Sequence, residues 1–299
     1  MTTRTLTPLT SLFSRFKRTK KLEERGLGFE DMLHSKQPIR IPDGQHILIC
    51  GLTGAGKSNL LANLILSQAD KACNSQSLLY GIDLKKGVEF TPYGPLWQQL
   101  ATNLNEAISL LEEINEELDW RCAWLIQNGQ RTYANDKPIY LFIDEAAELT
   151  GAIDRDARQQ QERARALLDR ILRQGRAVGI TVILATQDPR KEVSPFRDRC
   201  PTRIALRLNS KDETKMMLGD SAVTDGAAPW LIGHRQPGVG YLYDADRHRI
   251  IRFHVPYVDD DLIHDTASCC QRIDTLHGTD ASGDTSTTPE TKRATGRMA

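Results

Sequence analysis

The chain has 299 residues, of which 39% are hydrophobic and 26% are charged, a composition typical of one large globular domain or two small ones. Lysine and arginine together number 39, as do aspartate and glutamate, so the bulk charge neither requires nor excludes a polyanionic partner. No apolar run approaches the ~18–20 residues that a membrane-spanning helix needs, so we expect no transmembrane segment and a cytoplasmic location.

The cysteines point to the same compartment. They show no C-x-x-C pair and no histidine at metal-ligand spacing. We therefore expect reduced thiols, as in a cytosolic protein. The six are Cys50, Cys73, Cys122, Cys200, Cys269 and Cys270.

The first segment, residues 1–40, is polar and basic. Apolar residues between Leu9 and Phe16 fall at helical spacing among lysines and arginines. We expect a partly disordered basic amphipathic leader that docks on its own domain. The open alternative is contact with DNA, with a membrane surface or with a membrane-anchored partner, through residues 9–25.

The second segment, residues 41–257, alternates between strands and helices. Longer helical patterns separate the first four of its strand-length apolar runs, which predicts an α/β domain with a mostly parallel central sheet flanked by helices on both faces. The runs are residues 46–50, 77–83, 139–145, 179–186, 202–208 and 238–244. Residues 258–299 form a polar tail that we expect to be largely disordered, because from about His277 it has almost no large apolar residue.

The first chemical motif is the stretch "GLTGAGKS", which fits G-x-x-x-x-G-K-[ST] between a predicted strand and a predicted helix. Its amides can point at phosphate oxygens, Lys57 can reach the β and γ phosphates, and the Ser58 hydroxyl can ligate Mg²⁺. We thus expect a bound nucleotide and Mg²⁺ as cofactors. The predicted nucleotide-binding residues are Gly51, Leu52, Thr53, Gly54, Ala55, Gly56, Lys57, Ser58 and Asn59.

The second motif is "IYLFIDEAAEL", an apolar strand that ends in two adjacent carboxylates. We expect Asp144 to hold Mg²⁺ and Glu145 to orient the attacking water. If the strand continued through them, the two side chains would point to opposite faces of the sheet. The alternative is a strand end that leads into a helix whose first turn favours acidic residues.

A third stretch, "GRAVGITVILATQDP", is a buried strand with a polar end. We expect it to lie beside the strand of the phosphate loop, with its carboxyl end at the same crevice. Gln187 would then contact the γ-phosphate or the attacking water. An ordinary polar strand end entering a turn is the alternative.

Five blocks of the chain, in order, resemble the FtsK/SpoIIIE family of DNA-translocating motors: "GLTGAGKSNLL", "IDLKKGVEF", "LFIDEAAEL", "RQGRAVGITVILATQDP" and "PTRIALRLNSKDET". The shorter actinobacterial conjugative transfer proteins look closest in style. The resemblance, which covers about residues 41–257, implies a RecA-like P-loop NTPase domain that assembles as a ring, usually a hexamer, around double-stranded DNA.

Carried over by position, Lys57 and Ser58 resemble the Walker A pair, and Asp144 and Glu145 resemble the Walker B pair. Gln187 resembles the sensor residue.

The resemblance also implies an arginine finger that acts in a neighbouring subunit's site. Arg176 looks like a candidate for this catalytic role, and its alternative is an arginine at a helix end that favours the helix dipole. Arg203 and Arg207 are rival candidates.

Two departures from the family pattern stand out. We see no room for the membrane segment or for the winged-helix module of full-length members, and Asp188 replaces a basic residue of the block "ATQRP". Charge offers a partial argument for DNA, because residues 155–207 hold thirteen basic against six acidic residues. Lys85 and Lys86 are further candidates for DNA contact.

The sequence therefore predicts an ATP hydrolase that translocates double-stranded DNA, in conjugative transfer of a plasmid or integrative element or in chromosome segregation. Two alternatives stay open. One is a nucleotide-gated DNA-binding or regulatory protein that does not translocate. The other is a protein-export ATPase of the type VII secretion kind.

Overall fold

The computed structural model describes residues 30–31, 37–38, 44–133, 137–150, 155–189 and 196–279. The predicted leader lies outside the described residues, apart from two short strands, β1 (Glu30–Asp31) and β2 (Gln37–Pro38). Residues 280–299 of the predicted tail also lie outside them.

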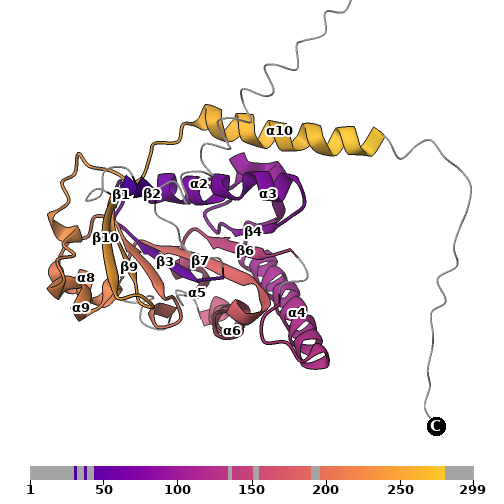
Figure 1. Cartoon of the computed structure of the whole chain (residues 1–299), viewed down its shortest axis with the longest axis horizontal. Helices are drawn as coiled ribbons and strands as arrows, with labels where there is room; N and C mark the ends of the chain where they lie inside the picture. Colours follow the sequence, from indigo (N-terminus) through magenta and orange to yellow (C-terminus); the bar gives the residue numbers. More distant parts are fainter. Residues whose placement is uncertain are drawn as a thin grey trace, which may run out of the picture.

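One ten-stranded sheet forms the centre of the described part of the chain, in the order β2-β1-β10-β9-β8-β3-β7-β6-β4-β5 (Figure 1). The run from β8 to β5 is parallel, and the pairs from β8 to β2 are antiparallel. This confirms the mostly parallel sheet. The strands are β3 (Ile47–Cys50), β4 (Leu78–Ile82), β5 (Trp97–Ala101), β6 (Ile139–Ile143), β7 (Ile180–Thr186), β8 (Thr202–Ala205), β9 (Val239–Asp244) and β10 (Arg249–His254).

Helices cover both faces of the sheet, as predicted (Figure 1). One face carries α2 (Lys57–Ser67), α3 (Ala69–Cys73) and α10 (Asp260–Thr279), and the other carries α4 (Leu104–Asn128) and α6 (Arg155–Gln174). The shorter helices are α5 (Ala146–Thr150), α8 (Lys211–Leu218) and α9 (Asp220–Thr224), with 3₁₀ turns η1 (Thr91–Leu96), η2 (Gly175–Val178) and η3 (Pro229–Leu231).

The central strands read as continuous apolar runs because both of their faces are buried. Along β3, Leu48 and Cys50 join the core under α4 and α6, whereas Ile47 and Ile49 join the core under α2 and α10. Every residue of β3, β6 and β7 is buried, which is the pattern of an inner parallel strand.

Four strands were not predicted from the sequence: β1 and β2, which lie within the predicted leader, and β5 and β10. β5 lies at the edge of the sheet, where its two glutamines face partly outward, so it carries no long apolar run. β10 alternates buried and exposed residues and contains two arginines. A strand that is solvated on one face has this alternating pattern.

The acidic helix α4 lies against the basic helix α6, and their charges pair. Arg163 contacts Glu112, and Arg170 contacts Asp119. The excess positive charge of residues 155–207 is therefore partly neutralised inside the chain, which weakens the argument for DNA from charge alone.

The prediction of a disordered tail from residue 258 onward is wrong for Asp260–Thr279, which form α10. Ile263, Ala267 and Cys270 are buried, and their spacing puts them on one face of the helix. That face packs on α2, α3 and η1. The polar composition of the last residues hid this apolar stripe.

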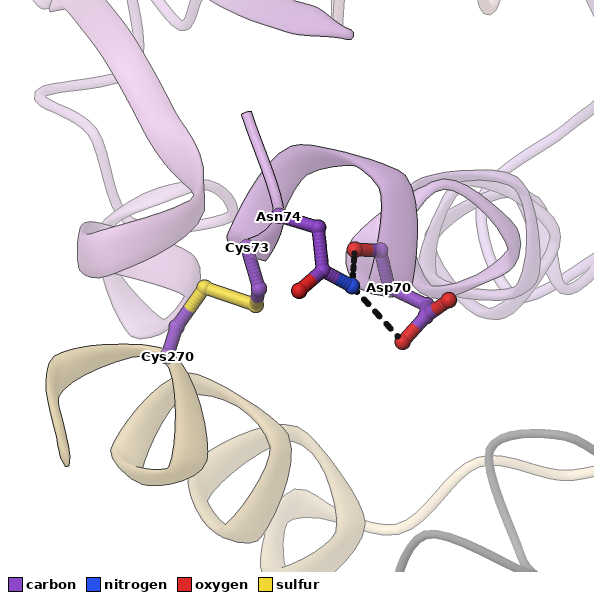
Figure 2. The surroundings of a disulfide bond; sticks show 4 residues. All are labelled: Asp70, Cys73, Asn74 and Cys270. Atoms are coloured by element: carbon purple, nitrogen blue, oxygen red, sulfur yellow. Dashed lines mark hydrogen bonds between the residues drawn. A yellow bond between two sulfur atoms is a disulfide. The ribbon is translucent and has the colours of Figure 1, made fainter. Parts of the chain in front are cut away.

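A disulfide joins Cys73, at the end of α3, to Cys270 in α10 (Figure 2). The prediction of reduced thiols is therefore wrong for these two residues. Cys50, Cys122, Cys200 and Cys269 are free. The bond connects residues 197 positions apart, so spacing along the sequence gave no sign of it.

Candidate active site

The strand order brings the phosphate loop and the acidic pair to one edge of the sheet. β7 pairs in parallel with β3 on one side and with β6 on the other. This confirms that the strand of "ITVILAT" lies beside the strand of the phosphate loop. The loop after β3, the acids after β6 and Gln187 after β7 consequently meet where parallel strands end, which is where open α/β sheets bind ligands.

Two glycines shape the phosphate loop. Gly54 and Gly56 have φ angles of 72° and 98°, a conformation that side chains disfavour. A Cβ on Gly56 would also lie 2.4 Å from the backbone nitrogen of Gly238. The amide of Gly238 in turn donates to the Ala55 carbonyl at 2.8 Å, so the start of β9 supports the loop from outside.

The loop presents unused backbone donors. Within the described part of the chain, the N–H groups of Thr53, Gly54 and Gly56 make no hydrogen bond. They precede α2, whose N-cap Gly56 has no side chain to cap the first turn. Free amides at a helix N-terminus form a site for phosphate oxygens.

The acidic pair converges instead of pointing to opposite faces. β6 ends at Ile143, so the alternating side-chain directions of a strand do not apply to Asp144 and Glu145. Lys57 Nζ lies 3.2 Å from the Asp144 carbonyl oxygen, 3.7 Å from Asp144 Oδ1 and 3.4 Å from Glu145 Oε2. Both acids are buried, and a buried carboxylate needs such a partner.

Gln187 connects the acid to the phosphate loop. Its backbone N–H donates to Glu145 Oε1 at 3.1 Å, and its side-chain Oε1 accepts from the Thr53 hydroxyl at 3.1 Å. The structure thus brings together Thr53, Lys57, Asp144, Glu145 and Gln187, which lie in three separate parts of the sequence.

A cavity of about 860 Å³ extends from these residues toward β10 and α10. Its lining also includes Gly238, His254, Tyr257 and Ile263. Ligand pockets for cofactor-sized molecules have volumes of roughly 300–1,000 Å³. The cavity is thus large enough for a nucleotide whose phosphates lie on the loop.

Asn59 has a role that the sequence did not suggest. Its side chain donates to the Pro256 carbonyl at 2.9 Å and accepts from the Val258 N–H at 2.8 Å. Asn59 lines the cavity, but its amide holds the segment after β10 against α2. It shapes the pocket through that segment.

The donors fit Mg²⁺. Ser58 is exposed and lines the cavity together with Asp144, so a hydroxyl and a carboxylate face the same space. Mg²⁺ prefers hard oxygen ligands and usually completes its shell with water and phosphate oxygens. No group of three or more His, Cys, Asp or Glu side chains in the described ranges forms a metal site.

The three candidate finger arginines lie in different places. The Arg176 side chain is 59% exposed, and among the described residues it forms an ion pair only with Asp246, at 3.2 Å. Arg176 precedes β7 and lies about 20 Å from the carboxyl end of that strand. Arg203 is nearly buried, bonded to the Cys200 carbonyl and placed over the Tyr243 ring. Arg207 donates to the Thr53 carbonyl of its own phosphate loop at 3.0 Å.

Lys85 belongs to the site, although the sequence suggested a DNA contact. Its Nζ lies 3.1 Å from Asp144 Oδ2 and 3.5 Å from Glu145 Oε2. Burial lowers the pKa of Lys85, but the carboxylates of Asp144 and Glu145 outweigh burial and raise the pKa above the ordinary lysine value. The block "IDLKKGVEF" was the only sequence signal. Lys86, its neighbour, is exposed.

Comparison with known proteins identifies the family of the chain. The model of the FtsK/SpoIIIE family matches residues 24–140. A sporulation regulatory protein of Streptomyces azureus is 30% identical over 209 residues, which are 66% of this chain and 67% of that protein. The chain belongs to the FtsK/SpoIIIE family. As a member of this family it is a P-loop ATPase.

Other members of the family are longer. The DNA translocase FtsK of Helicobacter pylori is 30% identical over 235 residues, which are 73% of this chain but 26% of that protein. EccCa1, an ESX-1 secretion system protein of Mycobacterium tuberculosis, is 29% identical over 240 residues, or 70% of this chain and 30% of that one. The chain therefore spans about a quarter to a third of these two relatives.

A solved structure shows the same fold. The pCW3 conjugation coupling protein TcpA, in its monomer form with ATPγS, has a TM-score of 0.68 and 23% sequence identity, over 86% of this chain and 72% of that one.

Among the helices that the structure describes, none is long and apolar enough to span a membrane.

Proposed function

We propose that the protein is an ATP-dependent double-stranded DNA translocase that acts in conjugative transfer or in DNA segregation. The observation that carries the proposal is the convergence of Lys57, Glu145 and Gln187 in a chain whose relatives include a protein named DNA translocase FtsK and a conjugation coupling protein.

The site is built for hydrolysis as well as binding. Glu145 is held from two sides, by the Gln187 N–H on Oε1 and by two ammonium groups on Oε2. A fixed carboxylate beside the phosphate loop can orient a water for attack on the γ-phosphate. Asp144 and Ser58 would hold Mg²⁺, which neutralises charge on the phosphate oxygens.

The protein would work as a ring, with a hexamer as the expected form. Of the three arginines, Arg176 suits a role in a neighbouring subunit because it is exposed and far from its own phosphate loop. Its surface ion pair with Asp246 costs little to break. Arg203 and Arg207 are committed to contacts within their own subunit.

DNA dependence of ATP turnover tests the proposal. The ATPase rate of the full chain is measured with double-stranded DNA, single-stranded DNA or no DNA, while light scattering follows assembly. Double-stranded DNA should stimulate turnover and promote a ring, and Lys57→Ala should abolish turnover. No stimulation by double-stranded DNA, or full turnover by the variant, would contradict the proposal.

Displacement of a third strand from a DNA triplex separates a motor from a nucleotide-gated binding protein. A translocase strips the third strand only with ATP. Binding of DNA without displacement would favour the regulatory alternative.

A protein-export ATPase is the second candidate, and the similarity to EccCa1 favours it. ATP turnover that responds to a secreted polypeptide and not to DNA would support that candidate.

A further inference from the structure

Lys85 contacts the two carboxylates that the hydrolysis site depends on, and nothing in the Walker motifs explains it. It stands in the loop between β4 and η1, 59 residues before Asp144 in the sequence. β4 pairs with β6 in parallel, so the carboxyl ends of these two strands place the lysine beside the acids.

The loop that carries Lys85 is held rigidly by Asp83. This aspartate is fully buried. Its Oδ1 accepts from the Lys85 N–H at 3.0 Å, and its Oδ2 accepts from the N–H groups of Glu89 and Phe90 at 2.8 and 3.2 Å. A carboxylate that receives three backbone donors fixes the turn around it. The backbone of Lys85 is therefore positioned before any ligand binds.

The ammonium groups of Lys57 and Lys85 contact different atoms of Asp144 but the same oxygen of Glu145. Lys57 lies on the carbonyl oxygen and Oδ1 side of Asp144, whereas Lys85 takes Oδ2. Both ammonium groups contact Glu145 Oε2. Since Lys57 is needed at the phosphates, Lys85 is the cation that can stay with the acidic pair.

We propose that Lys85 is a positioning residue of the hydrolysis site: its ammonium orients the Glu145 carboxylate and competes with the divalent cation for Asp144. The inference rests on the proposed ATP hydrolysis but not on DNA. An ammonium 3.1 Å from Asp144 Oδ2 repels a cation that seeks the same oxygen. Binding of the metal then requires the Lys85 ammonium to leave Asp144, while its contact with Glu145 can remain.

Manganese binding to the nucleotide-free protein tests the competition directly. Mn²⁺ is titrated into the full chain and free ion is followed by electron paramagnetic resonance. Lys85→Met, which keeps the length of the side chain without its charge, should bind Mn²⁺ about tenfold tighter than the wild type or more. Lys85→Arg and the matched control Lys86→Met should stay within about twofold. Unchanged Mn²⁺ affinity in Lys85→Met would overturn the proposal.

The kinetic readout tests orientation. Lys85→Met should lower kcat for ATP by about 10-fold to 100-fold with little change in KM, because the Glu145 carboxylate loses a fixed partner. Lys85→Arg should restore most of kcat. An equal loss in Lys86→Met, or no loss in Lys85→Met, would refute the role. If Lys85→Met does not fold, Lys85→Gln serves in both assays. These assays contain no DNA, so a failure of the translocase proposal leaves them interpretable.

Discussion

Replacing Cys73 and Cys270 with serine removes the disulfide that ties α10 to α3 (Figure 2). The bond closes a loop over nearly the whole α/β domain, from the end of α3 to the last described helix. We expect the double variant to fold, because Ile263 and Ala267 still bury the inner face of α10, but to unfold at a lower temperature.

The size of the loop sets the magnitude. For a separation of 197 residues, the chain-entropy model gives about 5 kcal/mol of stabilisation by the cross-link. A protein of this size shifts its Tm by roughly 2–4 °C per kcal/mol. The double variant should therefore melt about 10–20 °C below the oxidised wild type, and residual structure in the unfolded chain would reduce this shift.

Thermal melts with and without dithiothreitol test the reasoning. Reductant should lower the Tm of the wild type toward that of the variant and leave the variant unchanged. Cys269→Ser is the matched control, since Cys269 is free and adjacent to Cys270, and it should respond to reductant as the wild type does. A wild-type Tm that is insensitive to reductant would refute this reasoning, as would a non-reduced proteolytic digest without the disulfide-linked Cys73–Cys270 peptide pair.

Three further predictions follow from the site and the core. Glu145→Gln should lower kcat for ATP by about 100-fold or more while a fluorescent ATP analogue still binds; unchanged turnover would exclude Glu145 as the base. Gly56→Ala should cost about 3 kcal/mol in stability, measured by urea unfolding, because its Cβ meets the Gly238 nitrogen. Gly54→Ala has open space and should cost less. Burial, and then the charge of Arg176, lower the pKa of His46 from 6.5 to about 4. The unfolded chain therefore takes up the proton first, and stability should fall by about 2 kcal/mol between pH 7 and 5. His46→Gln should flatten that slope.

The parts of the fold that could be predicted are those with a strong local pattern. The inner strands are apolar throughout because both of their faces are covered, so they were visible as runs of residues. The phosphate loop and the acidic pair follow such runs directly, which made Lys57, Asp144 and Glu145 identifiable by context.

The parts that were missed depend on contacts between distant segments. Lys85 reaches Asp144 only because β4 lies next to β6, and strand order cannot be read from a pattern of hydrophobic residues. The disulfide and α10 depend on packing against α3 for the same reason. The basic character of α6 was read correctly from the sequence, but its partner was not, since the acidic α4 that neutralises it lies elsewhere in the chain.

β7 lies between two candidate functional residues, Gln187 and Arg176. Gln187 follows it on the side of the phosphate loop, and Arg176 precedes it at the opposite edge. The strand is buried along its length and hydrogen-bonded to β3 and β6, so it cannot stretch and bends little. Gln187 and the η2 turn are therefore held at a fixed distance by a strand that is paired on both sides. The hydrolysis site and the exposed Arg176 consequently belong to one rigid part of the molecule.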